Sequence, residues 1–382
     1  MKTPEIIPQS AADAIGEPTT AKAMAAPVTA APESRLGTDT SAHALAIAEL
    51  RRLLGAWHRH EPRARLGQDP EELHQLRVAV RRIDATLALF KRQLPESLVQ
   101  ARKTAKGVLR ALGGARDVDV QLAELSRYCA GLPETEGAAA EPLRRQLEAQ
   151  GARARARMVR LLDAAPTRRW LEDLSTATTA GVAVNATAAH SAFAVMPERV
   201  RQRFRKLRKS VRKLPKNASM EEFHEVRRRA KHLRYAIECG GSLFGKPAEE
   251  LLRALRRMQE KLGVHQDAHV ARSRLATLAA DSTAALPAAT LFLMGRLAER
   301  QSDVISQADR TLSRAWRRVR GKRWKAMRAR LGELSDRAPA PRRARAPVMR
   351  AAAAPAVTQA SPPAAAPANP LAEPAMASDS KH

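Results

Sequence analysis

The chain contains an internal repeat, which limits its fold more than any other feature of the sequence. The heptapeptide EELHQLR, which holds His74, recurs as EEFHEVR around His224, and the two histidines are 224 − 74 = 150 residues apart. A second pair of blocks has the same spacing: Leu112-Gly113 with Asp117 to Val120, and Leu262-Gly263 with Asp267 to Val270. Two separate blocks with one spacing indicate two copies of one structural unit, related by a pseudo-twofold axis.

Both copies are predicted to be helical. The chain between its two ends is rich in Ala, Leu, Arg and Glu, which favour helices, and its apolar residues recur every three or four positions. Helices are expected near residues 41–60, 70–93, 95–112, 117–130, 141–163, 167–180, 197–213, 220–239, 247–262, 266–280 and 288–330, the last one broken. The predicted fold is an all-α domain over residues 41–337, with repeat halves at about 41–180 and 195–335.

The two ends of the chain differ in composition from the helical part. Residues 1–40 and 338–382 are rich in Ala and Pro and lack hydrophobic periodicity, so both tails are expected to be disordered. No stretch of about 18 apolar residues is present, so no membrane span is expected. Cys129 and Cys239 are too few for a disulfide framework, which favours the reducing cytoplasm as the location.

The charge balance indicates a polyanionic partner. The sequence has 67 Lys and Arg against 39 Asp and Glu, a formal net charge of +28. Such an excess repels itself when the chain compacts, unless an anion binds to it. DNA, RNA, an anionic membrane and inorganic polyphosphate all fit this charge. The aromatic content of 3% is low for a protein that stacks single-stranded bases on aromatic side chains.

Each repeated His-containing helix is predicted to carry a column of basic side chains opposite its apolar side. In the first copy the column contains His74, Arg77, Arg81 and, at its edge, Arg82; in the second it contains His224, Arg227, Arg228, Lys231 and Arg234. One such column is usually a solvated face. Matched columns in two copies are different, because like charges on neighbouring helices destabilise each other unless an anion lies among them. The repeat therefore predicts a shared anion site.

Other basic residues also match between the copies. The further pairs are Arg51 with Arg201, Arg59 with Lys209, Lys103 with Arg253, and Lys106 with Arg256. Of these, Lys103 and Arg201 are included in the predicted site. The stretch Arg201–Lys213 contains eight Lys or Arg and an apolar stripe, so it is expected to form an amphipathic basic helix. Such a helix could bind nucleic acid or anionic lipid, and we interpret it as one wall of the same positive site.

The repeated Gly and Asp residues are interpreted as helix boundaries. Gly113-Gly114 and Gly263 would end a helix, and Asp117 and Asp267 would cap the next one, with Asp117 also able to orient Arg116. His265 and His269 have the i, i+4 spacing that permits a metal site. They lack the glutamate of the HExxH pattern and any Cys or carboxylate cluster, so neither a metal nor another cofactor is predicted.

These motifs resemble the CHAD domain, the "conserved histidine α-helical domain". HQLRVAVRRIDATLALF with LGGARDVDV is similar to its first half, and HEVRRRAKHLRYAIE with LGVHQDAHV to its second; the resemblance covers roughly residues 42–335. It implies two four-helix bundles around a basic pore or groove that binds inorganic polyphosphate, and association with polyphosphate or other storage granules. The implied binding residues are His74, Arg77, Arg81, Arg82, Arg116, His224, Arg227, Lys231 and Arg234. Gln266 stands where the second copy would repeat Arg116, so one guanidinium is missing there.

Two other function classes were weighed against polyphosphate binding. CHAD domains are often joined to a triphosphatase domain with an ExExK motif, but the nearest match, Glu134 to Gly137, lacks the Lys. No Gly-rich phosphate loop or nucleophile motif is present either, so the chain is not expected to be an enzyme. A nucleic-acid-binding protein is the alternative, and a storage-granule surface is a further predicted partner. A pocket between helices favours the thinner polyanion over a duplex.

Overall fold

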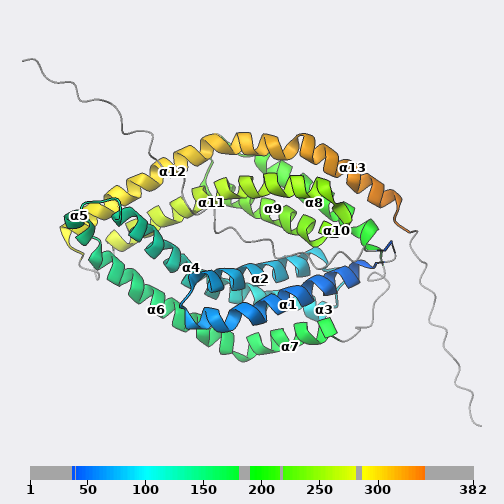
Figure 1. Cartoon of the computed structure of the whole chain (residues 1–382), viewed down its shortest axis with the longest axis horizontal. Helices are drawn as coiled ribbons and strands as arrows, with labels where there is room; N and C mark the ends of the chain where they lie inside the picture. Colours follow the sequence, from blue (N-terminus) through cyan, green and yellow to red (C-terminus); the bar gives the residue numbers. More distant parts are fainter. Residues whose placement is uncertain (1–36, 39, 180–189, 216–217, 281–285, 340–382) are drawn as a thin grey trace, which may run out of the picture. The chain divides into compact units, whose positions relative to one another are not determined.

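The computed structural model describes residues 37–38, 40–179, 190–215, 218–280 and 286–339, and these contain helices and no strand (Figure 1). The first repeat contains α1 (Ala42–Leu66), α2 (Pro70–Leu89), α3 (Glu96–Gln100), α4 (Arg102–Cys129), α5 (Glu134–Ala138), α6 (Glu141–Asp163) and α7 (Ala165–Thr179). The second contains α8 (Ala192–Arg212), α9 (Met220–Cys239), α10 (Gly241–Phe244), α11 (Lys246–Ala280), α12 (Ala288–Arg320) and α13 (Lys322–Asp336). The predicted disorder of the tails concerns residues that lie almost entirely outside the described ranges.

The helices of the two repeats pack in the same order, which confirms the all-α fold. In the first repeat α1 packs on α2 and α7, and α2 packs on α4. In the second repeat α8 packs on α9 and α13, and α9 packs on α11. The repeats meet where α2 contacts α9 and where α1 contacts α8. The two helices with the predicted basic columns are therefore neighbours in space.

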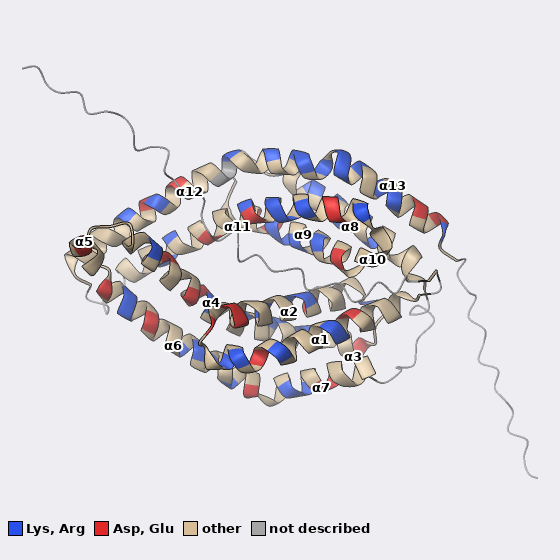
Figure 2. Ribbon diagram, in the orientation of Figure 1, with Lys and Arg blue, Asp and Glu red and all other residues tan. Residues whose placement is uncertain are grey.

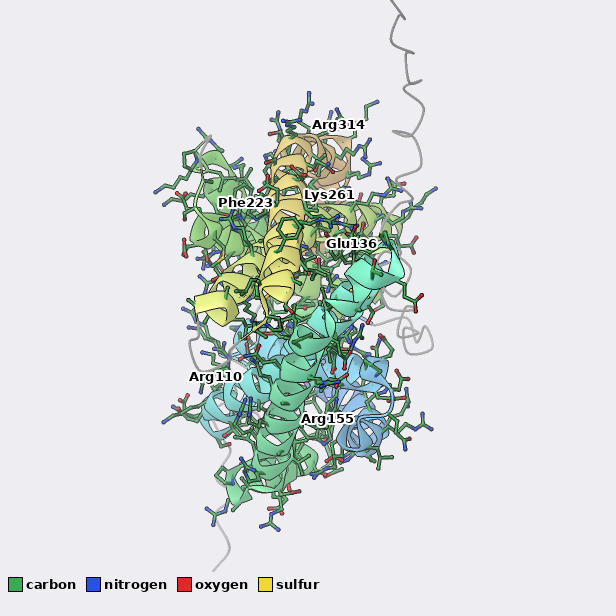
Figure 3. The ribbon with its side chains drawn as sticks, turned by 90° about the vertical axis from the view of Figure 1, so that its left-hand side faces the viewer. Arg110, Glu136, Arg155, Phe223, Lys261 and Arg314 are labelled. Atoms are coloured by element: carbon green, nitrogen blue, oxygen red, sulfur yellow. The ribbon has the colours of Figure 1, made fainter. Side chains whose placement is uncertain are left out.

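A single apolar core runs through both repeats. It includes Leu76 and Leu87 of α2 and Val226 and Leu233 of α9, all fully buried. Burial of this apolar stripe is what fixes the orientation of the basic side of each helix. A second apolar cluster joins the carboxyl ends of α4 and α11 to the amino-terminal parts of α6 and α12. Figure 3 shows this end of the molecule, where Glu136 of α5 forms an ion pair with α12.

The predicted helix boundaries at the repeated glycines are wrong. α4 continues without a break from Arg102 to Cys129, and α11 continues from Lys246 to Ala280. Gly113 and Gly263 are therefore interior helical residues, although each costs the helix about 0.5–1 kcal/mol relative to Ala. The apolar stripe explains the continuity, because Leu112, Ala115 and Val118 are all buried. Asp117 and Asp267 are consequently not N-caps.

The starts of α2 and α9 agree with the sequence prediction. Asp69 accepts a hydrogen bond from the backbone N–H of Glu71 and Pro70 is the first helical residue. Ser219 and Glu222 form a reciprocal capping box at the start of α9. Each cap sets the start of its helix eight residues before Arg77 or Arg227. Among the described helices, none is both long and apolar enough to cross a membrane.

Candidate anion-binding site

The side chain of Arg77 leaves α2 and lies over the repeated Gly and Asp of α4. A Cβ atom placed on Gly113 would be in van der Waals contact with Cζ and Nη2 of Arg77, at 3.7 Å, so the guanidinium lies directly over this glycine, where a larger side chain would extend. One turn later, Oδ1 of Asp117 accepts a hydrogen bond from Arg77 Nη1 at 3.4 Å. The glycine and aspartate of the LGxxxD motif therefore form a recess, which we call a notch, for the arginine of the His-x-x-Arg motif. The glycine leaves the helix surface open to the guanidinium, and the aspartate accepts its hydrogen bond.

The second repeat builds the same notch. A Cβ atom on Gly263 would lie 3.5 Å from Nη2 of Arg227. Arg227 Nη1 donates to Asp267 Oδ1 at 3.3 Å and to Gln266 Oε1 at 3.2 Å. Gln266, where the resemblance implied a missing guanidinium, thus helps to hold Arg227. The arginine, glycine and aspartate of the two notches all correspond at the 150-residue spacing, because 227 − 77, 263 − 113 and 267 − 117 are equal.

The two arginines converge with Arg81 and Lys231 into one group of four cations, which we call the paired-arginine cluster. Burial lowers the pKa of Arg77, and Arg81 and Arg227 lower it further against the opposing effect of Asp117. Burial also lowers the pKa of Lys231 well below that of an ordinary lysine, and Arg227, Arg81 and Arg77 add to this shift. Positive charges from both repeats are thus concentrated where α2 meets α9.

His74 and Arg116 flank this cluster on the side of the first repeat. Burial lowers the pKa of His74, Glu71 raises it, and Arg116, Arg81 and Arg77 lower it. The ring is therefore close to three guanidinium groups. A neutral ring can donate one hydrogen bond to an anion, and a protonated ring can donate two.

Several nitrogen donors of the site are buried without a partner. The Nε atoms of Arg77, Arg116 and Arg227 have no hydrogen-bond partner among the described residues. Arginine nitrogens are donors only, and buried donors are almost always satisfied in native proteins. An anion that enters the cluster would satisfy them.

Two predicted site residues are paired with an acidic residue instead. Glu238 near the carboxyl end of α9 accepts a hydrogen bond from Arg82 at 3.1 Å. Arg234 and Arg256 lie 3.6 Å from the same carboxylate. Arg82 and Arg234 are only 18% and 12% exposed, so this network holds α2 against α9. These three arginines share one carboxylate, so they are held in place by an ion pair before any ligand binds.

The remaining predicted residues are exposed or bonded to other helices. Arg201 donates to Ser335 Oγ of α13 at 3.2 Å, and its counterpart Arg51 donates to the backbone oxygen of Thr178 in α7. This matched pair therefore ties equivalent helices together and serves structure. Three further members of the predicted set are exposed: Lys103, His224 and Arg228, the last of which pairs with Glu225. The two histidines are thus inequivalent, because His74 is half-buried among arginines and His224 is exposed.

The predicted amphipathic basic helix is part of α8, and Figure 2 shows Lys and Arg in blue over this part of the molecule. Arg199, Arg203 and Lys206 follow one another at i, i+4 and i+7, a spacing that puts them on one face of the helix. The comparison of matched charges did not single out these three residues, because none has a basic counterpart in the first copy. Among the residues that the structure describes, no group of three or more His, Cys, Asp or Glu is placed to hold a metal ion.

Comparisons with known proteins agree with this fold. The family model of the CHAD domain matches residues 48–276, and no curated protein matches the chain. PptA from Streptomyces chartreusis has a similar fold, with a TM-score of 0.59 and 20% identity over 73% of this chain and 100% of its own. The CHAD domain from the plant Ricinus communis has a TM-score of 0.55 and 24% identity, over 78% and 93% of the two chains. The chain therefore belongs to the CHAD domain family.

Proposed function

We propose that this protein binds inorganic polyphosphate through the paired-arginine cluster, with His74 and Arg116 as further contacts. The observation that carries this proposal is the convergence of two duplicated arginines, each held in a Gly–Asp notch, on one place between the repeats. Arginine forks bind two oxygens of one phosphate, and Lys231 adds a point charge. Bound phosphates would relieve the repulsion among the four cations.

The shape of the site favours a thin polyanion over a nucleic-acid duplex. Arg77 and Arg227 are only 26% and 18% exposed, so their charge is accessible from a narrow direction between helices. A duplex presents phosphates on a wide, stiff cylinder and is bound by exposed cations. A flexible phosphate chain can enter between the side chains of α2 and α9. By this account the protein acts in the cytoplasm and associates with polyphosphate or related storage granules.

A competition experiment tests this choice of ligand. Labelled polyphosphate is bound to the full chain near physiological ionic strength, and unlabelled polyphosphate or duplex DNA is added as competitor. We expect DNA to displace the label only at much higher phosphate concentration than polyphosphate does. Displacement by DNA at equal phosphate concentration would favour the alternative function, a basic helical protein that binds nucleic acid.

We further propose that the chain binds polyphosphate without hydrolysing it. The two carboxylates beside the cluster, Asp117 and Asp267, accept hydrogen bonds from its arginines, so neither is free to activate a nucleophile. Incubation with long polyphosphate, with and without a divalent metal, should release no phosphate above a protein-free control. Release that depends on the protein would contradict this proposal.

Filling the Gly113 notch should weaken binding without removing any charge. In a Gly113→Leu chain the side chain would extend into the space of the Arg77 guanidinium and displace it. We expect the affinity for polyphosphate to fall about tenfold, which corresponds to about 1.4 kcal/mol. The matched control is Gly114→Leu, because a side chain at Gly114 meets nothing within 4 Å. Equal affinity of the two variants, with both folded by thermal unfolding, would disprove the notch.

Binding should strengthen in acid because of His74. Its pKa is lowered in the free protein, so the ring is neutral at pH 7 and becomes protonated only below the ordinary value of about 6.5. A bound anion raises this pKa, so the affinity should rise as pH falls from about 7.5 to about 5. The free protein should lose stability over the same range, because the unfolded chain binds the proton more readily. Titrations of a His74→Asn chain should show a smaller pH dependence of the affinity, and an unchanged dependence would exclude His74 from the site.

A further inference from the structure

A second group of cations lies on α8, separate from the paired-arginine cluster. Its members, which we call the α8 cluster, are Arg199, Arg203 and Lys206 of α8, Arg229 of α9, and Lys91 and Arg92 after α2. On α9, Arg229 and His232 lie away from the side that carries Arg227 and Lys231. At 100° per residue, Arg229 is about 160° from both of these residues, and His232 is about 140° from Arg227 and about 100° from Lys231. The two groups of cations share no member.

The cations of the α8 cluster act strongly on one another. Burial lowers the pKa of Arg203, and Arg199, Arg229 and Arg102 lower it further. Burial and Arg92 lower the pKa of Arg199, and burial with Arg203, Arg229, Lys91 and Arg199 lowers that of Lys206. His232 belongs to the same surroundings: burial, Arg203, Arg228 and Arg229 lower its pKa to about 4, against Asp84. The neutral ring adds no charge to the cluster but can donate a hydrogen bond.

The nearby carboxylates are already engaged with other basic residues. Asp84 accepts from Arg102 at 2.9 Å, Glu198 accepts from Arg205 at 2.7 Å, and Glu225 pairs with Arg228 and Arg229. Neither Arg199 nor Arg203 has an ion-pair partner within the part of the chain that the structure describes. The half-buried arginines at the centre of the cluster therefore have no direct ion pair, although the charge of Glu198 acts on Arg199.

The equivalent contact in the other half, between α1 and α9, has acidic residues where the contact between α8 and α2 has none. The residue equivalent to Arg199 is Glu49 (199 − 150), which accepts from Arg52 at 2.7 Å. The residue equivalent to Glu238 is Ala88 (238 − 150), which lies beside the α8 cluster. The contact between α1 and α9 thus has two carboxylates, Glu49 and Glu238. At the equivalent positions, the contact between α8 and α2 has Arg199 and Ala88. The acids are therefore present on one side only.

A small surface pocket adjoins the α8 cluster. Its lining comes from α2, α8 and α9 and includes Ala85, Ala88, Arg203, His232 and Tyr235. The Nδ1 atom of His232 is buried and has no hydrogen-bond partner among the described residues. Small side chains on α2 leave the space, while an arginine and a histidine supply donors at its edge.

From this arrangement we infer that the α8 cluster is a second binding site for linear polyphosphate, separate from the paired-arginine cluster and without a counterpart at the equivalent place between α1 and α9. This inference rests on the proposed function for the class of ligand. A short chain occupies each site independently. A long chain that leaves one site can reach the other, so its attachment benefits from a high effective concentration.

The stoichiometry of tripolyphosphate binding, measured by calorimetry on the full chain, tests the inference. We expect two tripolyphosphates per wild-type protein, one per Arg199→Gln/Arg203→Gln chain, and one per Arg77→Ala/Arg227→Ala chain. For long polyphosphate we expect the affinity of the Arg199→Gln/Arg203→Gln chain to fall about tenfold through loss of the second attachment. The matched control is Arg314→Gln/Arg317→Gln, which removes two exposed arginines of α12. Lys206→Glu reverses an exposed charge of the cluster and provides a variant with no buried change.

The outcomes separate this inference from the proposed function. A single wild-type site that Arg77→Ala/Arg227→Ala abolishes, and that Arg199→Gln/Arg203→Gln and Lys206→Glu leave intact, would overturn the α8 site and leave the proposed function standing. A site that survives Arg77→Ala/Arg227→Ala but is lost in Arg199→Gln/Arg203→Gln would support the α8 site and move the function away from the paired-arginine cluster. No binding of any polyphosphate by the wild type would overturn both.

Discussion

A chain with Arg77→Ala and Arg227→Ala together should bind polyphosphate at least about a hundredfold more weakly than the wild type. A hydrogen bond to a charged group contributes about 1.5–3 kcal/mol, so the loss of two such contacts removes about 3 kcal/mol or more. Each arginine is already held in its notch by Gly and Asp, so it loses little conformational entropy when a phosphate binds. Fluorescence anisotropy of labelled polyphosphate at fixed salt measures the effect.

The control for this variant removes the same charge elsewhere. Arg157 of α6 and Arg314 of α12 are both exposed, and Arg314 is labelled in Figure 3. The Arg157→Ala/Arg314→Ala chain has the same net charge as the double variant, so it measures what long-range attraction alone contributes. We expect its affinity to change by less than about threefold. Equal losses in the two double variants would mean that net charge, and not the converging arginines, determines binding.

Replacement of Lys231 by Met should stabilise the free protein and weaken binding in the same chain. Met has a similar length but no charge, so the variant avoids burying an ammonium group among three arginines. We expect the free energy of unfolding to rise by about 1–2 kcal/mol and the affinity for polyphosphate to fall about tenfold. Chemical denaturation and anisotropy measure the two changes.

The pH dependence of stability adds a second readout for Lys231. Its pKa in the folded chain is lowered, so the unfolded chain binds the proton more tightly and the wild type gains stability as pH rises toward the ordinary lysine value of about 10.4. The Lys231→Met chain should lack this contribution. Lys261→Met is the matched control, because Lys261 is exposed on α11 and should show neither change. A Lys231→Met chain that is less stable than the wild type would show that the lysine serves the fold.

A variant that gains stability but loses affinity distinguishes a binding site from a structural ion network. Glu238 and its arginines are an example of the second kind, since all three cations lie within 3.6 Å of one carboxylate that joins them. In the paired-arginine cluster Asp117 and Asp267 pair with the two arginines, and among the described residues neither Arg81 nor Lys231 has an ion-pair partner. Removing a charge from the first network should destabilise the fold, and removing one from the cluster should stabilise it.

The repeat made much of the fold and the centre of the site predictable. Local propensity and apolar spacing predicted the helices, and the duplicated His-x-x-Arg motif predicted that α2 and α9 share a site. The roles of Gly113 and Asp117 were misread, because a glycine pair followed by Asp is typical of a helix end. The apolar stripe that passes through Leu112, Ala115 and Val118 was the signal for an unbroken helix.

Other site predictions depended on packing that one sequence does not reveal. Arg82 is in the predicted basic column, but it pairs with Glu238, which is 156 positions away in the sequence. This pairing depends on how α2 and α9 pack against each other. Arg201 matches Arg51, yet both serve to join helices. Conversely, a search for matched charges cannot find the α8 cluster, because Glu49 stands in the first copy where Arg199 stands in the second.

A crystal structure of the protein with bound polyphosphate would test the central claim most directly. We predict consecutive phosphates between α2 and α9, with oxygen atoms within about 3 Å of the guanidinium groups of both Arg77 and Arg227. A chain bound on an outer surface, with these two arginines still confined to their aspartates and no phosphate between them, would contradict the account.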